Sequence, residues 1–401
     1  MLVDSVSPLS SATSVAEGAV FEVMSLEQLE SFSPALLLRL LRPYATFLEG
    51  HGVPTTDIAT DERWFGRLYR CLNSENPALP VELRQALMAV GDLANDHSSD
   101  SVVSLVRSRG VHPDWITPQD LALLAYLDHR DLFEAAHVRS RAADARRFVE
   151  FVGKDSRGPS VAALEHGRRP FAERLGRWFS ERNRTAFCDV RILETEREVR
   201  FLIIHGRPMR NQGAIETDEQ RGRVIYVPDK HDLIVFDRNT GRLAVNAQFA
   251  REQNLYRDAI GEAFWGDAEH FRAAPVFSGQ PLLDLGSAAV DTYGVPGVER
   301  VVLRELTVVS RATLGQAITW TGPDLSAQLD SGLGLLVRQQ GVVTAFRLDL
   351  TITGRKRPMR LDIRVPNHWC FDRRVNADLV REYLLEAGFM SLPEADLALT
   401  A

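Results

Sequence analysis

The chain has 401 residues, a formal net charge of −7, 45% hydrophobic residues and 25% charged residues. These fractions exclude an intrinsically disordered chain, and the length predicts two or three domains that each bury a core. The 47 basic residues are 44 arginines and three lysines, Lys154, Lys230 and Lys356. A GC-rich genome explains an arginine excess, and phosphate recognition is compatible with it. The scarcity of lysine disfavours phosphate-loop and Schiff-base chemistry.

The three cysteines, Cys71, Cys188 and Cys370, are far apart, and no CxxC pair is present. This pattern disfavours a disulfide framework or a cysteine-rich zinc site and fits a reducing compartment. The N-terminal segment carries Asp4 and has no basic region, so we do not interpret it as a signal peptide. No run reaches about 18 uncharged apolar residues, which is the length of a membrane span. We therefore expect a cytoplasmic protein with no membrane contact.

The first half of the chain is predicted to be helical. We expect residues 1–18 to form a flexible N-terminus and residues 19–185 to form a helical domain. Within that domain, Ser33 and Pro34 begin a helix that ends at Gly50, and Thr117 and Pro118 begin another. Residues 98–109 are also predicted to form a helix, and the charged segment 129–153 is expected to continue the bundle.

The second half is predicted to be rich in strands. We expect residues 186–297 to form an α/β domain with a central sheet, 298–390 to form a C-terminal sheet with a terminal helix, and 391–401 to form a tail. In the first of these domains, residues 188–194 and 197–206 are expected to pair, and the apolar run 233–236 predicts a central strand covered on both faces.

Two helices are predicted around these strands. Tyr256, Ile260 and Phe264 lie on one face of a helix that ends at Gly266. The terminal helix is expected to be capped by Asn376 and to end at Gly388. The predicted fold class is therefore α+β, with an N-terminal all-helical domain followed by an antiparallel or mixed β-sheet region with flanking helices.

The charge changes sign before the first predicted sheet. Residues 1–135 carry 19 acidic and 9 basic side chains, whereas residues 136–184 carry 6 acidic and 12 basic ones. A helix after Pro170 would dock through an apolar stripe and leave an arginine stripe free to bind phosphates. The alternative is an ordinary solvated face whose arginines pair with Glu173 and Glu181. The candidate anion-binding residues are Arg168 and Arg169, just before the helix, and Arg174, Arg177 and Arg184 on the stripe.

A second candidate is the segment 205–213, HGRPMRNQG, which follows a predicted strand. Loops at strand ends often carry function, and His205 could act as a general base or donate a hydrogen bond to an anion. Arg207 and Arg210 would add positive charge there. The alternative interpretation is a polar β turn.

Catalytic motifs are scarce. A nuclease that resembles restriction enzymes needs an Asp and a Glu-x-Lys on neighbouring strands, but Asp232 is followed on the next strand by Asn246, Ala247 and Gln248. His205 and Asp232 are therefore candidates only for a divergent metal-dependent nuclease or phosphodiesterase. The sequence has no dinucleotide-binding loop, phosphate loop, zinc-protease motif or nucleophile elbow, so we expect no metal site and no cofactor.

The C-terminal region carries two further polar segments. Residues 354–358, GRKRP, predict a basic turn between two strands. Residues 364–374 leave the second strand at Pro366, and Asn367, His368, Arg373 and Arg374 could lie on a surface loop. Trp369 and Phe371 are expected to cover the sheet, and base stacking is the alternative.

Several segments resemble bacterial proteins encoded in mobile or anti-phage defence islands, namely 205–213, 232–248, 255–271 and 359–374. The resemblance implies a defence-linked role and brings no catalytic residues with it. We expect a non-catalytic sensor or adaptor that binds nucleic acid or a partner protein of the same operon through the basic segment. The alternatives are the divergent nuclease and a purely structural partner-binding protein.

Overall fold

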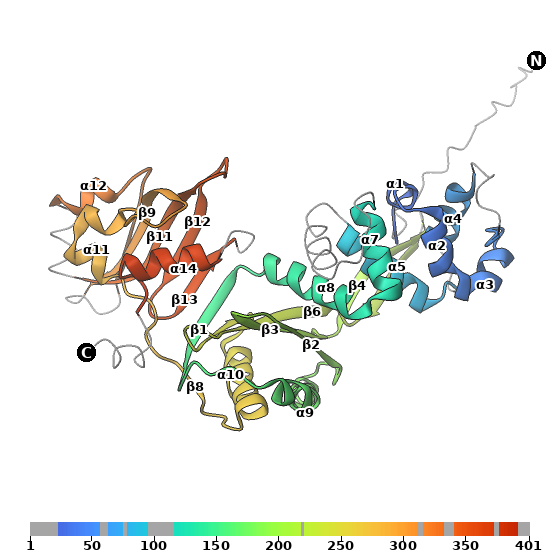
Figure 1. Cartoon of the computed structure of the whole chain (residues 1–401), viewed down its shortest axis with the longest axis horizontal. Coiled ribbons are helices and arrows are strands. Elements are labelled where there is room, and N and C mark those ends of the chain that lie inside the picture. Colours follow the sequence, from blue (N-terminus) through green and yellow to red (C-terminus); the bar gives the residue numbers. More distant parts are fainter. Residues whose placement is uncertain are drawn as a thin grey trace, which may run out of the picture. The chain divides into compact units, whose positions relative to one another are not determined.

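The computed structural model describes residues 23–56, 63–74, 78–94, 116–217, 220–310, 316–332, 341–372 and 377–391 (Figure 1). Four sequence predictions lie outside these residues: the flexible segment 1–18, the helix 98–109, the Asn376 cap and the tail after Ser391. The described chain forms two compact units. Unit 1 comprises Met1–Phe133 with Asn211–Ile225, and unit 2 comprises Glu134–Arg210 with Tyr226–Ala401.

Unit 1 is mainly helical. Thr117 accepts a hydrogen bond from Asp120 N at 3.1 Å and caps the predicted helix, whose first residue is Pro118. The predicted helix 34–50 is divided, because Pro43 lies in a 3₁₀ turn and has no backbone N–H to continue an α-helix. The described helices of this unit are α1 (Leu26–Glu30), α2 (Pro34–Leu41), η1 (Arg42–Tyr44), α3 (Ala45–Gly50), α4 (Trp64–Asn73), α5 (Val81–Ala94) and α7 (Pro118–Asp128).

The segment 129–153 is only partly helical. Helix α8 covers Arg130–Asp144, but β1 (Arg147–Gly153) is a strand, so the helical prediction is wrong there. Phe148, Val149 and Phe151 are aromatic or β-branched and are all buried, which suits a strand that packs on both faces. The sheet therefore begins before residue 186, inside the region predicted to be entirely helical.

Unit 2 is built on one antiparallel sheet with eleven described strands in the order β10-β9-β11-β12-β13-β1-β7-β6-β3-β2, with β8 paired to β1. The two predicted β regions thus form a single sheet, in which β1 lies between β13 and β7. The predicted α+β class, with helices before the sheet region, is confirmed. The other strands are β2 (Cys188–Glu194), β3 (Glu198–Gly206), β6 (Asp229–Asp237), β7 (Arg242–Asn246), β8 (Phe271–Arg272), β9 (Val298–Ser310), β10 (Ala317–Thr321), β11 (Gly341–Ile352), β12 (Met359–Arg364) and β13 (His368–Phe371).

Several local predictions are confirmed. Strands β2 and β3 pair, and the run 233–236 lies in β6, between β3 and β7. The helix through Tyr256 ends at Gly266, whose φ of +69° is the left-handed conformation that favours glycine. A separate two-stranded sheet joins β3 to β6 and consists of β4 (Arg210–Thr217) and β5 (Gln220–Tyr226).

Two hydrophobic cores lie on opposite faces of the sheet of unit 2. One contains Phe148 and the inner side of the terminal helix, and the other contains Val149, Phe151 and the helices that Figure 1 shows against strands β1, β3 and β6. The described helices of this unit are most of α8 (Arg130–Asp144), α9 (Val161–Ser180), α10 (Ala250–Trp265), α11 (Gln280–Asp284), η3 (Gly286–Val290), α12 (Ser326–Leu329) and α14 (Ala377–Glu386). α9 and α10 belong to the second core, and α14 to the first.

Strand β12 has one buried face and one face toward solvent. Met359, Leu361 and Ile363 are buried in the core beneath α14, whereas Arg360, Asp362 and Arg364 alternate with them and are more exposed. This alternation is typical of an antiparallel strand with one face toward solvent. The polar face of β12 therefore remains accessible.

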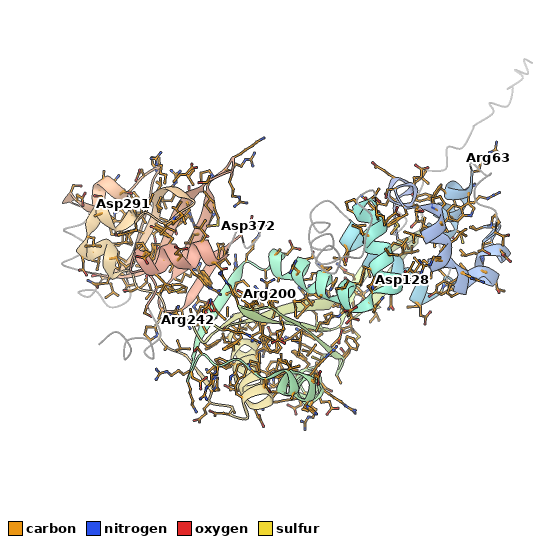
Figure 2. All side chains as sticks on the ribbon, viewed as in Figure 1. Arg63, Asp128, Arg200, Arg242, Asp291 and Asp372 are labelled. Carbon is orange, nitrogen blue, oxygen red and sulfur yellow. The ribbon has the colours of Figure 1, made fainter. Side chains whose placement is uncertain are left out.

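An ion cluster fixes α14 on the sheet. Arg381, a buried residue of α14, donates to Glu198 Oε1 at 3.2 Å and to Asp237 Oδ2 at 2.8 Å. Glu198 also pairs with Arg200, one of the residues labelled in Figure 2, at 2.8 Å. The cluster joins the terminal helix to β3 and β6.

No described helix of either unit is both long and apolar enough to cross a membrane.

Candidate functional site

The arginine-rich helix begins earlier than predicted. α9 starts at Val161, where Ser160 Oγ accepts a hydrogen bond from Ala163 N at 3.1 Å, and it passes through Pro170. Arg168 and Arg169 therefore lie inside the helix rather than before it. The strong cap at Ser160 and the apolar stripe on both sides of Pro170 favour one long helix over a start at the proline.

Most of the arginines on α9 already have carboxylate partners. Arg169 pairs with Glu173 at 2.8 Å and Arg168 with Asp189 at 3.6 Å. Arg174 pairs with Glu262 of α10. Arg177 is exposed and has no ion pair within the described part of the chain. The helix therefore presents a largely compensated surface, which agrees more with the solvated-face alternative than with a free arginine stripe.

Arg184 does not lie on the helix stripe. α9 ends at Ser180, and the Arg184 side chain is 5% exposed and donates to Glu252 Oε1 at 2.7 Å. Arg184 thus faces the interior of unit 2, and its predicted place on an exposed stripe is wrong.

The structure brings His205 and Asp232 together. Both lie on adjacent strands, β3 and β6, and His205 Nε2 is 3.0 Å from Asp232 Oδ2. Tyr256 of α10 donates from its hydroxyl to the same oxygen at 2.6 Å. The imidazole ring of His205 stacks on Phe179 with 4.1 Å between ring centroids. His205 therefore lies in a strand and its side chain is buried, so it does not lie in the surface loop that we predicted.

Lys230 extends this group to further charges. Its ammonium group lies 3.1 Å from Asp232 Oδ1 and 2.9 Å from Oε2 of Glu252, which also pairs with Arg184. We call these six residues the buried network: Arg184, His205, Lys230, Asp232, Glu252 and Tyr256. Its two carboxylates face the cationic groups of Lys230 and Arg184, so their charges compensate.

Burial and contacts set the ionisation in the network. Burial opposes ionisation of Asp232, but the hydrogen bond with His205, the charge of Lys230 and the hydrogen bond from Tyr256 together lower the pKa of its carboxyl. Burial, together with Asp232, raises the pKa of Tyr256 well above its usual value. Burial, aided by Asp189 and Asp232, raises the pKa of the neighbouring Cys188 to about 12, so its thiol stays protonated at neutral pH.

The network can stabilise the fold, but it is poorly placed for catalysis. His205 is 0% exposed and Asp232 is 2% exposed, and the polar atoms of both are occupied by neighbours. A substrate would have to displace Phe179 and Tyr256 to reach them. Within the described residues, no three His, Cys, Asp or Glu side chains are grouped so that they could hold a metal ion.

Arg207 and Arg210 lie after the buried end of β3. Arg207 is half-buried, and its backbone N–H donates to Pro228 O at 2.7 Å. Arg210 is exposed at the first position of β4. The predicted segment 205–213 is therefore divided between β3, a short connection and β4, and its three named residues do not form one cluster.

A concave basic surface lies elsewhere in unit 2. It is a pocket of about 840 Å³ between the start of β1, the turn that follows β11, and strands β12 and β13. We call it the basic pocket. Its lining residues are Arg146, Arg147, Gly354, Arg355, Lys356, Arg357, Pro358, Met359, Arg360, Asp362, Cys370, Phe371 and Asp372, of which Asp372 is labelled in Figure 2.

Cationic groups dominate the basic pocket. Six lining residues are cationic and two are acidic, which leaves a net of four positive charges. Arg360 pairs with Asp362 at 2.8 Å, and Arg355 approaches Asp372 at 3.5 Å. The remaining four cations have no ion pair within the described ranges; they are Arg146, Arg147, Lys356 and Arg357. Unlike those of α9, most of the cations here remain available to an external anion.

Sheet pairing explains why sequence analysis did not find this site. It identified the basic turn 354–358 only as a turn and counted Arg146 and Arg147 with the helical segment. In the structure, β1 pairs with β13 so that Arg147 lies opposite Cys370, and Cys370 lies opposite Asp362 of β12. The sequence shows basic residues both at 146–147 and at 354–358, but only the order of the strands in the sheet brings the two segments together.

No protein-family model matches the chain, and the comparison with curated proteins finds no match. The function must therefore be argued from the residues and their geometry.

Proposed function

We propose that the protein is a non-catalytic component that binds nucleic acid through the basic pocket. In this proposal it acts in the bacterial cytoplasm as the sensor or adaptor of a multi-protein system. The resemblance of several segments to proteins of defence islands suggests that this system is directed against phages.

The observation that carries the proposal is a group of four cations that line one pocket and have no ion pair with any described residue. Arginine and lysine contacts to phosphate supply most of the affinity of sequence-independent nucleic-acid binding. The open polar face of β12 adjoins these cations, so a phosphate backbone can approach without displacing a helix. The α9 face offers less, because carboxylates already neutralise most of its arginines.

The pocket favours binding over chemistry. Among the described residues, no histidine, serine or tyrosine lines it. Burial opposes ionisation of Asp362, but hydrogen bonds from Arg360 and Arg347 lower the pKa of its carboxyl, so it remains an ionised partner of two arginines. A general acid would need a raised pKa instead. The residues of the pocket are thus suited to holding an anion.

The adaptor part of the proposal rests on the division of the chain. Unit 1 contributes no residue to the basic pocket and has its own buried core, which includes Trp64, Leu68 and Leu87. A protein partner could therefore be bound by unit 1 while unit 2 holds nucleic acid.

The test compares two double charge reversals in the full chain. Lys356→Glu with Arg357→Glu alters the basic pocket, and Arg168→Glu with Arg169→Glu is the matched control on α9. Fluorescence anisotropy with labelled single- and double-stranded DNA and RNA measures the affinity between about 50 and 200 mM salt. We expect the first variant to bind more weakly and to lower the slope of log affinity against log salt by about 2, because two phosphate contacts are lost.

The control should bind like the unaltered chain. If instead the α9 variant loses binding and the pocket variant does not, the pocket is the wrong site. If the unaltered chain binds no nucleic acid at low salt, the proposed function is wrong.

A further inference from the structure

We propose that the basic pocket accepts an oligophosphate group, the di- or triphosphate of either a free nucleotide or a 5′ end of RNA. The inference rests on the proposed function, since it assigns the ligand of the same pocket. It adds that the pocket binds the end of a phosphate chain rather than the interior of a nucleic-acid backbone.

The density of charge is the first argument. Along a nucleic-acid strand each phosphodiester carries one negative charge, and successive charges are spaced by about 3.4 Å per strand in a duplex. A terminal phosphate carries about 1.5 to 2 charges, and each further phosphate of a di- or triphosphate adds about one on an adjacent phosphorus. A net of four positive charges around one pocket matches a di- or triphosphate better than it matches a single phosphodiester of a backbone.

The shape of the pocket is the second argument. A volume of about 840 Å³ lies in the range of small-ligand sites, which is about 300–1,000 Å³. The pocket is lined from two directions, because Arg146 and Arg147 come from the start of β1 whereas Lys356 and Arg357 come from the turn after β11. A compact anion can contact both sides at once.

The lining chemistry is the third argument. Phe371 is the one aromatic residue among the described residues that line the pocket, and it is 2% exposed, so it offers no ring face to a base. Stacking on aromatic rings is a main way in which proteins bind unpaired bases. The pocket therefore recognises the phosphate part of its ligand and leaves the base outside.

Local geometry prepares the cations for this task. Arg360 is paired with Asp362 at 2.8 Å and Arg355 lies 3.5 Å from Asp372, so the charge available to a ligand comes mainly from Arg146, Arg147, Lys356 and Arg357. Gly354 has a φ of +81°, a conformation that favours glycine and turns the chain directly before Arg355. Arginines such as Arg146, Arg147 and Arg357 can bind phosphate oxygens through two parallel hydrogen bonds.

The experiment uses the full chain and two RNAs of identical sequence, one with a 5′-triphosphate and one with a 5′-hydroxyl. Anisotropy measures the affinity for each, and isothermal titration measures the binding of inorganic tripolyphosphate and of ATP. We expect the 5′-triphosphate RNA to bind about tenfold or more tightly, since one additional charge-assisted contact corresponds to such a factor. The preference should vanish in Lys356→Glu with Arg357→Glu and persist in Arg168→Glu with Arg169→Glu.

The arms of the experiment separate the sources of the ligand. If tripolyphosphate and ATP bind in competition with RNA while the two RNAs bind equally, the source is a free nucleotide. Equal affinity for both RNAs together with no binding of tripolyphosphate would overturn this inference and leave nucleic-acid binding intact. Binding of tripolyphosphate without any binding of RNA would overturn the proposed function and support the oligophosphate site.

Discussion

The substitution Lys230→Met tests whether the buried network stabilises unit 2. The ammonium group of Lys230 lies 3.1 Å from one carboxylate, that of Asp232, and 2.9 Å from the other, that of Glu252. These side chains are 2% and 0% exposed, so water cannot replace the lost cation. Removing one partner of a buried ion pair costs about 3–5 kcal/mol, and since Lys230 contacts two carboxylates we expect a loss of about 4 kcal/mol in the free energy of unfolding.

The chain offers a matched control in Lys154→Met. Lys154 also makes an ion pair, with Asp267 at 2.5 Å, but its side chain is 55% exposed. A pair of this kind contributes about 1 kcal/mol or less. Urea unfolding of the full chain, with hydrogen exchange of β3 and β6 as the probe of unit 2, measures both variants. Adding Glu252→Gln to Lys230→Met removes the surplus negative charge and should restore part of the stability.

The reasoning fails if Lys230→Met and Lys154→Met lower the stability of unit 2 by the same amount. It also fails if Glu252→Gln further destabilises the Lys230→Met variant by its full individual cost, because the two positions would then be independent.

Three further predictions concern packing, pH and the terminal helix. Gly167→Ala should destabilise unit 2 by about 1–3 kcal/mol in urea unfolding, since an added Cβ would lie 2.6 Å from the carbonyl oxygen of Ala263 where α9 meets α10. Burial, aided by the charges of Arg191 and Arg141, lowers the pKa of His137 to about 3. The unfolded chain therefore binds a proton first as the pH falls below 6.5, so the free energy of unfolding should fall between pH 7 and pH 5 by about 2 kcal/mol less in His137→Gln than in the unaltered chain, as measured by urea unfolding at both pH values. Arg381→Met leaves two buried carboxylates without their shared cation and should cost about 3–5 kcal/mol, with α14 amides exchanging faster; unchanged exchange there would contradict it.

Local sequence signals predicted much of the fold. The pairing of β2 with β3, the strand at 233–236 and the end of α10 at Gly266 depend on residues that are close in the sequence, and all three are confirmed. β1 was missed because its seven residues follow a long helical pattern and its charged positions obscure the strand period. Its pairing partners stand about a hundred and about two hundred residues later, where no local pattern can identify them.

For the candidate sites too, the sequence predicted which residues are polar or charged but not which distant residues contact them. Sequence analysis named His205 and Asp232 together as candidates for a divergent nuclease or phosphodiesterase, and the structure brings them into contact through the pairing of β3 with β6. It could not predict that Phe179 and Tyr256 enclose them, because packing decides accessibility. For α9 the sequence placed Arg174 and Arg177 on a helix correctly, but Arg184 lies outside it, and the partners Asp189 and Glu262 of Arg168 and Arg174 come from other elements. Charge patterns thus locate basic residues without showing which remain uncompensated.

The position of β1 in the sheet also has a consequence for synthesis on the ribosome. Phe148 lies opposite Trp369, so β1 leaves the ribosome about 220 residues before its partner β13 exists. At about 5–20 residues per second, this interval lasts about 10–45 seconds. During that time one edge of β1 exposes unpaired backbone groups, and such an edge can pair with another chain. Nascent chains that stop before residue 368 should therefore associate with chaperones or aggregate, while release of the complete chain closes the sheet.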